Sequence, residues 1–166
     1  LVHKKYNLKK YLEAKNITTM NMIADRKFII KNGLYFNESF KGYGLEDYEF
    51  GYRVIKKGFK IKLINANIIH NEQNKTFKDF LHKVYILGKN AMPVLIDQNY
   101  EAAKEINFYK FENNYLIKKL IKFKFTNLLL KVLIQILIFF ENKIYLKNLY
   151  YFGIYLSYLK GAFSRK

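Results

Sequence analysis

The sequence predicts an α/β domain followed by a helical, basic C-terminal region. A helical pattern begins at Leu45, with apolar residues at three- and four-residue steps, and ends before Gly58. Residues 59–64 then alternate apolar side chains with lysine, which is typical of a strand with one buried face. From Thr76 onward the apolar residues recur with helical spacing, so we expect helices over the rest of the chain.

The other predicted elements follow from local patterns and breakers. They are a weak helical segment over 1–17, a short buried strand over 18–23, a short helix over 24–32 ended by Gly33, a helix from an N-cap at Thr76 that Pro93 kinks or ends, and a helix over about 100–111. Composition shifts toward helical, basic sequence in the last part of the chain. We therefore divide the chain into residues 1–95 and 96–166.

Composition excludes several classes of protein. The chain is 51% hydrophobic and 18% aromatic, so it has ample material for a core and is not wholly disordered. It has no cysteine, which excludes disulfides and thiolate zinc sites, and its three histidines are scattered. The lysines near Leu1 are not followed by an apolar stretch, so no signal peptide is visible, and any targeting segment is expected upstream.

The stretch F-K-G-Y-G-L-E-D-Y-E-F-G-Y-R over residues 40–53 carries the candidate chemistry. Glu46 and Asp47 fall in the first helical turn, where free N–H groups and the helix dipole favour negative charge by roughly 0.3–1 kcal/mol. Gly42 and Gly44 precede them, and glycine suits a positive φ or a close approach to a ligand. From these residues alone, a catalytic pair and a simple helix terminus both stay open.

Three neighbours of this pair also have structural explanations. Glu49 and Arg53 have the favourable i,i+4 order, which predicts an ion pair worth about 0.2–0.5 kcal/mol on an exposed helix. Tyr43 lies between the two glycines. Its ring is suited to stacking on a ring-shaped ligand, and equally to filling an apolar contact.

Together with its flanks, this stretch resembles the acceptor-side segment of inverting glycosyltransferases with the GT-A fold, including family 2 and the C-terminal region of β-1,4-galactosyltransferases. The matching motifs are T-M-N-M-I over 19–23, G-L-Y-F-N-E-S-F over 33–40, the glycine and Glu-Asp loop, G-Y-R and K-K-G-F-K-I after it, and A-N-I-I-H over 66–70. The resemblance covers roughly Asn21 to His70. In place of the aspartate that relatives carry in G-G-F-D, this chain has Asn37, which forms turns equally well.

The resemblance implies the C-terminal half of a GT-A nucleotide-diphospho-sugar transferase domain, followed by the helical tail. It implies transfer of a sugar, with inversion, from a nucleotide-diphosphate donor to a saccharide or lipid-linked acceptor. Asp47 would be the general base. The residues expected to bind substrate are Glu46, Gly44, Tyr43 and Asn21.

The resemblance also implies a divalent metal, Mn²⁺ or Mg²⁺, with His70 near the metal–diphosphate centre. Without the resemblance, a structural role for His70 stays open. The family's Asp-x-Asp metal motif does not occur in the 166 residues, and we expect it upstream of Leu1. The chain is therefore expected to be a piece of a larger enzyme. The alternative is an inactive fragment or a membrane-surface or interaction module that lacks the donor-binding half.

The net charge of +17 calls for a partner, because a field this strong attracts nucleic acid, an anionic membrane or phosphorylated substrates. No helix-turn-helix, RNP or zinc pattern is present, so nucleic acid is not expected. Residues 110–166 hold eleven Lys and Arg against Glu112 and Glu141, in the most apolar part of the chain. This combination favours an anionic membrane surface.

Residues 128–140 are almost wholly apolar and are broken by Lys131 and Gln135, which form a polar stripe with Lys124 and Asn142. The run is shorter than the ~20 residues of a spanning helix, so we expect a buried or interfacial helix. Packing on the catalytic domain or on a twin subunit stays open. We prefer a cytoplasmic protein attached to the inner face of the cell membrane. A bacterial source and a role in surface polysaccharide or lipooligosaccharide assembly follow by analogy.

Overall fold

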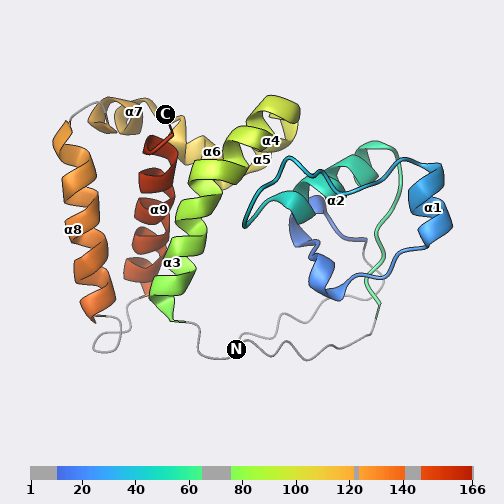
Figure 1. Cartoon of the computed structure of the whole chain (residues 1–166), viewed down its shortest axis with the longest axis horizontal. Helices are drawn as coiled ribbons and strands as arrows, with labels where there is room; N and C mark the ends of the chain where they lie inside the picture. Colours follow the sequence, from blue (N-terminus) through green and yellow to red (C-terminus); the bar gives the residue numbers. More distant parts are fainter. Residues whose placement is uncertain (1–10, 65–75, 122–123, 141–146, 166) are drawn as a thin grey trace. The chain divides into compact units, whose positions relative to one another are not determined.

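The structure is a computed structural model that describes residues 11–64, 76–121, 124–140 and 147–165 (Figure 1). Its chain divides into two compact units. Unit 1 comprises Leu1–Glu38 and Glu46–Asn71, and unit 2 comprises Ser39–Leu45 and Glu72–Lys166. The sequence-based division between residues 95 and 96 stays a prediction.

The predicted α/β fold, the C-terminal half of a GT-A domain, is wrong for the part of the chain that the structure describes. Helices dominate there, no sheet forms, and the one strand-like pairing is an isolated antiparallel bridge between Tyr11 and Lys62. Residues 59–64 do alternate between half-buried and exposed side chains, as predicted. Among the described residues, their backbone pairing is limited to contacts such as the hydrogen bond from Leu12 N–H to the Ile61 carbonyl oxygen at 2.8 Å. Alternation selects a buried face, but it does not supply a partner strand.

Unit 1 is built from short helices around a small core. Its elements are the 3₁₀ helices η1 (Ala14–Asn16) and η2 (Thr19–Asn21) and the α-helices α1 (Arg26–Lys31) and α2 (Glu46–Lys56). The strand predicted over 18–23 is therefore wrong, since η2 occupies its centre. Glycines with positive φ, Gly33 at +60° and Gly58 at +82°, follow α1 and α2 as predicted. The core residues are Leu34, Phe50 and Val54.

Unit 2 is helical, as predicted for the C-terminal part of the chain. Its elements are α3 (Phe77–Ile86), the π-helical segment η3 (Leu87–Ala91), α4 (Met92–Gln98), α5 (Tyr100–Glu105), α6 (Asn107–Glu112), α7 (Tyr115–Ile121), α8 (Lys124–Phe140) and α9 (Lys147–Phe163). Thr76 caps α3 in a reciprocal capping box with Asp79, which confirms the predicted cap. These hydrogen bonds lower the pKa of Asp79. The helix predicted over 100–111 is interrupted at Ile106.

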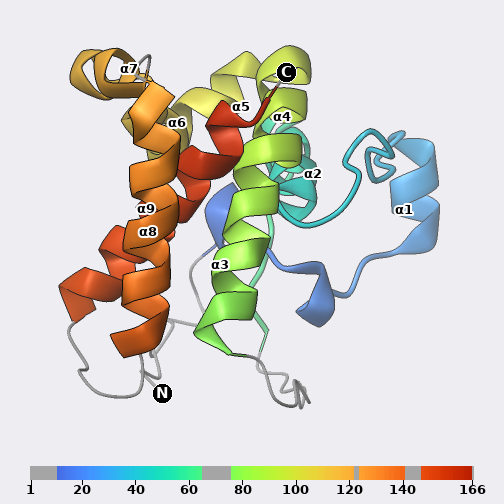
Figure 2. The same ribbon diagram turned by 60° about the vertical axis from the view of Figure 1, so that its left-hand side comes forward.

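Helix α9 lies between α3 and α8 in unit 2 (Figures 1 and 2). The core of the three helices contains Leu81 of α3, Leu130 and Ile134 of α8, and Leu156 of α9. The Ser157 hydroxyl donates a hydrogen bond of 2.6 Å to the Leu81 carbonyl oxygen, which satisfies the polar atom that α9 buries here. Among the described helices, none is long and apolar enough to cross a membrane.

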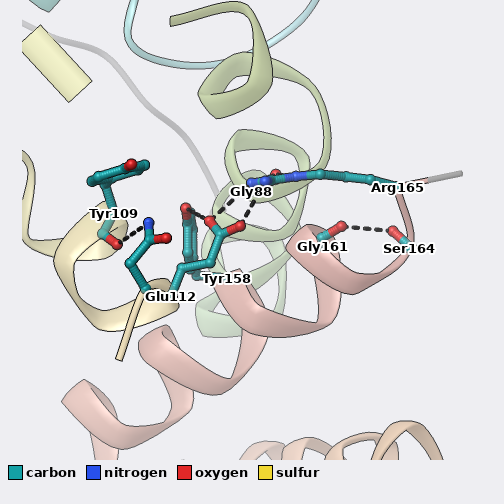
Figure 3. Close-up of polar contacts among 8 residues, drawn as sticks. Gly88, Tyr109, Glu112, Tyr158, Gly161, Ser164 and Arg165 are labelled. Carbon is teal, nitrogen blue, oxygen red and sulfur yellow. Dashed lines mark hydrogen bonds and ion pairs between the residues drawn. The ribbon is translucent and has the colours of Figure 1, made fainter. Parts of the chain in front are cut away.

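A cluster of polar side chains joins the C-terminal end of α9 to α6 and η3 (Figure 3). The Glu112 carboxylate accepts hydrogen bonds from the Tyr158 hydroxyl at 2.6 Å and from Arg165 Nη1 at 2.7 Å. Arg165 also donates through Nε, at 2.8 Å, to the Gly88 carbonyl oxygen in η3. Burial and the neighbouring carboxylate raise the pKa of Tyr158. The cluster therefore joins α6, η3 and α9 through charge-assisted hydrogen bonds.

Two glycines let α9 approach the α3–η3 segment at backbone distance. A Cβ at Gly161 would overlap the Tyr85 carbonyl oxygen, and a Cβ at Gly88 would overlap the Tyr158 carbonyl oxygen. Gly153 is also in α9, but a Cβ there would meet side-chain atoms only, the nearest being Leu137 Cδ1 at 3.2 Å. A side chain can shift to make room for an added Cβ, whereas the backbone of a packed helix cannot.

This difference makes Gly161→Ala and Gly153→Ala a matched pair. Alanine at 161 should lower the free energy of unfolding by about 2 kcal/mol, because backbone must move apart. Alanine at 153 should change it by less than about 1 kcal/mol, because improved helix propensity offsets a small side-chain shift. Urea denaturation followed by circular dichroism measures both values. Equal effects of the two substitutions would contradict the close approach at Gly161.

Candidate active site

The backbone before α2 has an unusual conformation. Gly42 and Gly44 have φ of +97° and +104°, which confirms the predicted need for glycine, and Leu45 follows with φ of +72°. A positive φ at a bulky residue is a true outlier and costs of order 1–3 kcal/mol. Such outliers cluster at active sites, and this one directly precedes Glu46, the first residue of α2.

Glu46 and Asp47 occupy the first turn of α2, as predicted. Asp47 Oδ2 accepts a hydrogen bond of 3.1 Å from the Thr19 backbone N–H, which fixes one oxygen of the carboxylate. Asp47 Oδ1 and Glu46 Oε2 are buried and have no hydrogen-bond partner among the described residues. A buried acceptor without a donor is costly, so these two oxygens are suited to accept hydrogen bonds from hydroxyl groups.

The η1–η2 segment packs tightly on α2, and this contact positions Thr19. Gly51 is buried, and a Cβ at this position would overlap Ile17 Cδ1. Sequence reasoning missed both Thr19 and Gly51 as positioning residues. A backbone N–H leaves no signal in a sequence, whereas a glycine inside a helical pattern is a visible sign of close approach.

The predicted ion pair between Glu49 and Arg53 is confirmed. Arg53 Nε lies 2.6 Å from Glu49 Oε1, and its Nη2 donates to the Tyr35 carbonyl oxygen at 2.6 Å. Glu49 is only 3% exposed, so this pair is buried on the carboxylate side and differs from the exposed pair that the spacing suggested. Arg53 also lies 5.8 Å from the Phe50 ring centroid. The pair thereby ties α2 to the loop that carries Tyr35.

The other predicted site residues are not all brought together. Tyr43 and Gly44 belong to unit 2, where Tyr43 is exposed and the Lys83 ammonium lies 4.9 Å from its ring centroid. Asn21 is an exposed residue at the end of η2. His70, the predicted metal ligand, lies outside the described residues.

Asn21 helps to line a cavity of about 610 Å³ in unit 1. The apolar part of its wall includes Phe28, Phe50 and Ile61, and Asp25 contributes a carboxylate. A mostly apolar hollow with a few polar groups is the usual character of a small-molecule site. Asn21 is thus a predicted substrate-binding residue that lines this cavity.

A divalent metal needs several donor groups that converge on one point. Among the described residues, no three His, Cys, Asp or Glu side chains come close enough together to hold a metal ion. In the described part of the chain, buried carboxylate oxygens without a hydrogen-bond partner belong to Glu46, Asp47 and Glu49, and these three side chains do not form a group that could hold a metal ion. The described residues therefore do not by themselves make a metal centre of the kind the resemblance implies.

Residues 1–82 match a family model described as the N-terminal domain of galactosyltransferase. The match supports a galactosyltransferase-like family for this part of the chain, and with it glycosyl transfer in general between a nucleotide-sugar donor and an acceptor. All the predicted site residues lie inside the matched range. No curated protein and no solved structure matches the chain. The bacterial origin and the C-terminal position within the family domain stay predictions.

The Glu49–Arg53 pair provides a test of how α2 is held. Glu49→Ala should lower the free energy of unfolding by about 2 kcal/mol, because it leaves a partly buried guanidinium without its carboxylate. Glu101→Ala is the control, since Glu101 forms an exposed i,i+3 pair with Lys104 and should matter by less than about 0.5 kcal/mol. Denaturant titration measures both. A Glu49 variant as stable as the Glu101 variant would contradict the buried pair.

Proposed function

We propose that this chain contributes the acceptor side of an inverting glycosyltransferase, with Asp47 as the general base. The reaction would move a sugar from a nucleotide-diphosphate donor to a saccharide or lipid-linked acceptor. The observation that supports this role is the asymmetry of the Asp47 carboxylate: Oδ2 is held by Thr19, while Oδ1 is buried without a donor. The family match over residues 1–82 supports the general activity.

The chemistry asks a sugar hydroxyl to attack the anomeric carbon opposite a departing nucleotide diphosphate. A carboxylate must accept the hydroxyl proton as the new C–O bond forms, at hydrogen-bond range. In the proposed arrangement, Asp47 Oδ1 accepts this proton, and the Thr19 N–H keeps the carboxylate oriented. Glu46 would hold a neighbouring hydroxyl of the acceptor through Oε2, and Tyr43, Gly44 and Asn21 would complete the substrate contacts.

The proposed cofactor is Mn²⁺ or Mg²⁺, with His70 as one ligand. When bound, such an ion neutralises charge that develops on the diphosphate leaving group. The remaining ligands would come from the Asp-x-Asp motif expected upstream of Leu1.

The proposed setting is the cytoplasmic face of a bacterial cell membrane, with the protein attached peripherally. A lipid-linked acceptor in polysaccharide or lipooligosaccharide assembly suits this setting. The net charge of +17 supports attraction to an anionic surface.

Asp47→Asn in the full-length protein should lower turnover by about 10²–10⁴-fold, the usual effect of losing a general base, and leave donor binding nearly unchanged. Glu46→Gln should mainly raise KM for the acceptor, because it weakens a binding contact. Glu38→Gln, at an exposed site in the same unit, is the control and should leave both parameters unchanged. Initial rates with a nucleotide sugar and a range of acceptors give kcat and KM. Wild-type turnover in the Asp47 variant would remove Asp47 from the mechanism.

His70→Ala should weaken donor binding only when a divalent metal is present, because the substitution removes one proposed ligand. Titration calorimetry with a nucleotide sugar, with and without Mn²⁺, measures this difference. His82→Ala is a suitable control, since His82 is an exposed residue of α3. The same metal dependence in the His70 variant and the wild type would assign His70 a structural role.

A further inference from the structure

Helix α8 is apolar on two faces. One face is buried in unit 2 through Leu130 and Ile134, which contact the core formed with α3 and α9. The other, the outer face of α8, consists of exposed apolar side chains that are between 40% and 66% accessible. They are Leu128, Leu129, Val132, Ile136, Phe139 and Phe140.

This outer face is too apolar for an ordinary water-exposed helix. A helix at the surface of a domain normally carries polar residues opposite its buried stripe. Between residues 128 and 140 the polar residues are Lys131 and Gln135, which lie side by side at one edge of the outer face. A contiguous exposed apolar surface of this kind marks an interaction site.

Charge identifies the partner. Helices α7, α8 and α9 contain no acidic residue, and Lys119, Lys131 and Lys147 are exposed on them. A second copy would bring the same basic surface to the contact, and like charges would oppose the pairing. An anionic lipid surface offers both an apolar interior for the outer face and negative headgroups for the lysines.

Aromatic side chains have a suitable distribution for the same partner. Phe139 and Phe140 lie at the end of α8, Tyr115 is 75% exposed at the start of α7, and Tyr151 is 53% exposed in α9. Aromatic side chains are favoured at the boundary between headgroups and acyl chains. Since α8 has 17 residues and one flank buried against α9, it is suited to lie in the plane of this boundary.

We propose that the outer face of α8 docks unit 2 on an anionic lipid bilayer, with Lys119, Lys131 and Lys147 contacting the headgroups. This inference rests on the proposed membrane setting and adds the surface that makes the contact. It also assigns different roles within the tail. Helix α9 serves the core, because Leu156, Tyr158 and Leu159 are buried.

This division of roles determines the experiment. Deleting residues 113–166 would remove α8 and α9 together and destroy the core with α3, so surface substitutions are needed. The test variant is Leu129→Gln/Ile136→Gln/Phe139→Gln. The matched control is Met20→Gln/Ile30→Gln/Tyr35→Gln, three exposed apolar residues of unit 1. Glutamine preserves helix propensity, and circular dichroism confirms that each variant is folded.

Binding of the full chain is measured by co-sedimentation with vesicles of phosphatidylcholine alone and of an equal mixture with phosphatidylglycerol. The α8 variant should bind the mixed vesicles at least about tenfold more weakly than the wild type, since it loses apolar burial. The control variant should bind as the wild type does. Lys119→Gln/Lys131→Gln/Lys147→Gln should lower affinity for the mixed vesicles about a hundredfold and remove the preference over neutral vesicles.

No donor or acceptor is present in this measurement, so it is independent of the proposed transfer reaction. Asp47→Asn should bind vesicles as the wild type does. Wild-type binding by the folded α8 variant would overturn the proposal. A wild-type dimer that the α8 variant makes monomeric in analytical ultracentrifugation, without vesicle binding by either protein, would also overturn it and assign the outer face to a second copy.

Discussion

The first two turns of α2 carry three carboxylates, Glu46, Asp47 and Glu49, in a partly buried position, and unit 1 is organised around that constraint. Each acid is tolerated for a different reason. Glu49 has the Arg53 guanidinium, which in turn satisfies the Tyr35 carbonyl oxygen, and Asp47 has the Thr19 N–H. The helix N-terminus favours negative charge at Glu46 and Asp47, but leaves Glu46 Oε2 and Asp47 Oδ1 without a donor. The pairing of Glu49 with Arg53 thus stabilises α2, while the first turn leaves two carboxylate oxygens without a hydrogen-bond donor among the described residues.

Local signals predicted the helical parts of this protein well. The ends of α1 and α2 at glycines, the Thr76 cap and the position of Glu46 and Asp47 all depend on short-range backbone chemistry, which is visible in a few consecutive residues. The predicted sheet was wrong because a strand depends on a distant partner. Residues 59–64 alternate correctly, yet Tyr11–Lys62 is an isolated bridge among the described residues. Resemblance to GT-A enzymes supported a sheet that the described chain does not form.

The candidate site shows the same division between local and long-range information. The position of the Glu46–Asp47 pair in the first helical turn and the ion pair between Glu49 and Arg53 could both be predicted from the sequence. The contact from Thr19 to Asp47 spans 28 residues and uses a backbone group, so no side-chain pattern encodes it. Gly51 is a glycine inside a helical pattern, a sign of close approach that sequence reasoning missed, and nothing in the sequence identifies Ile17 as its partner. The burial of Glu49, which is 3% exposed, likewise depends on tertiary packing that periodicity alone does not reveal.

Helix α8 illustrates why hydropathy cannot separate a core helix from an interfacial one. Its residues are apolar almost all round, and the sequence left packing and membrane contact as alternatives. In the structure α9 buries only one flank of α8, and the outer face of α8 stays exposed. Small residues permit α9 to approach the α3–η3 segment on its other side: Gly161 and Gly88 admit the neighbouring backbone, and Ser157 satisfies a carbonyl oxygen of α3. A bulkier α9 would weaken the core, whereas polar residues on the outer face would leave it intact. The core therefore does not explain why the outer face is apolar, and a partner outside the unit does.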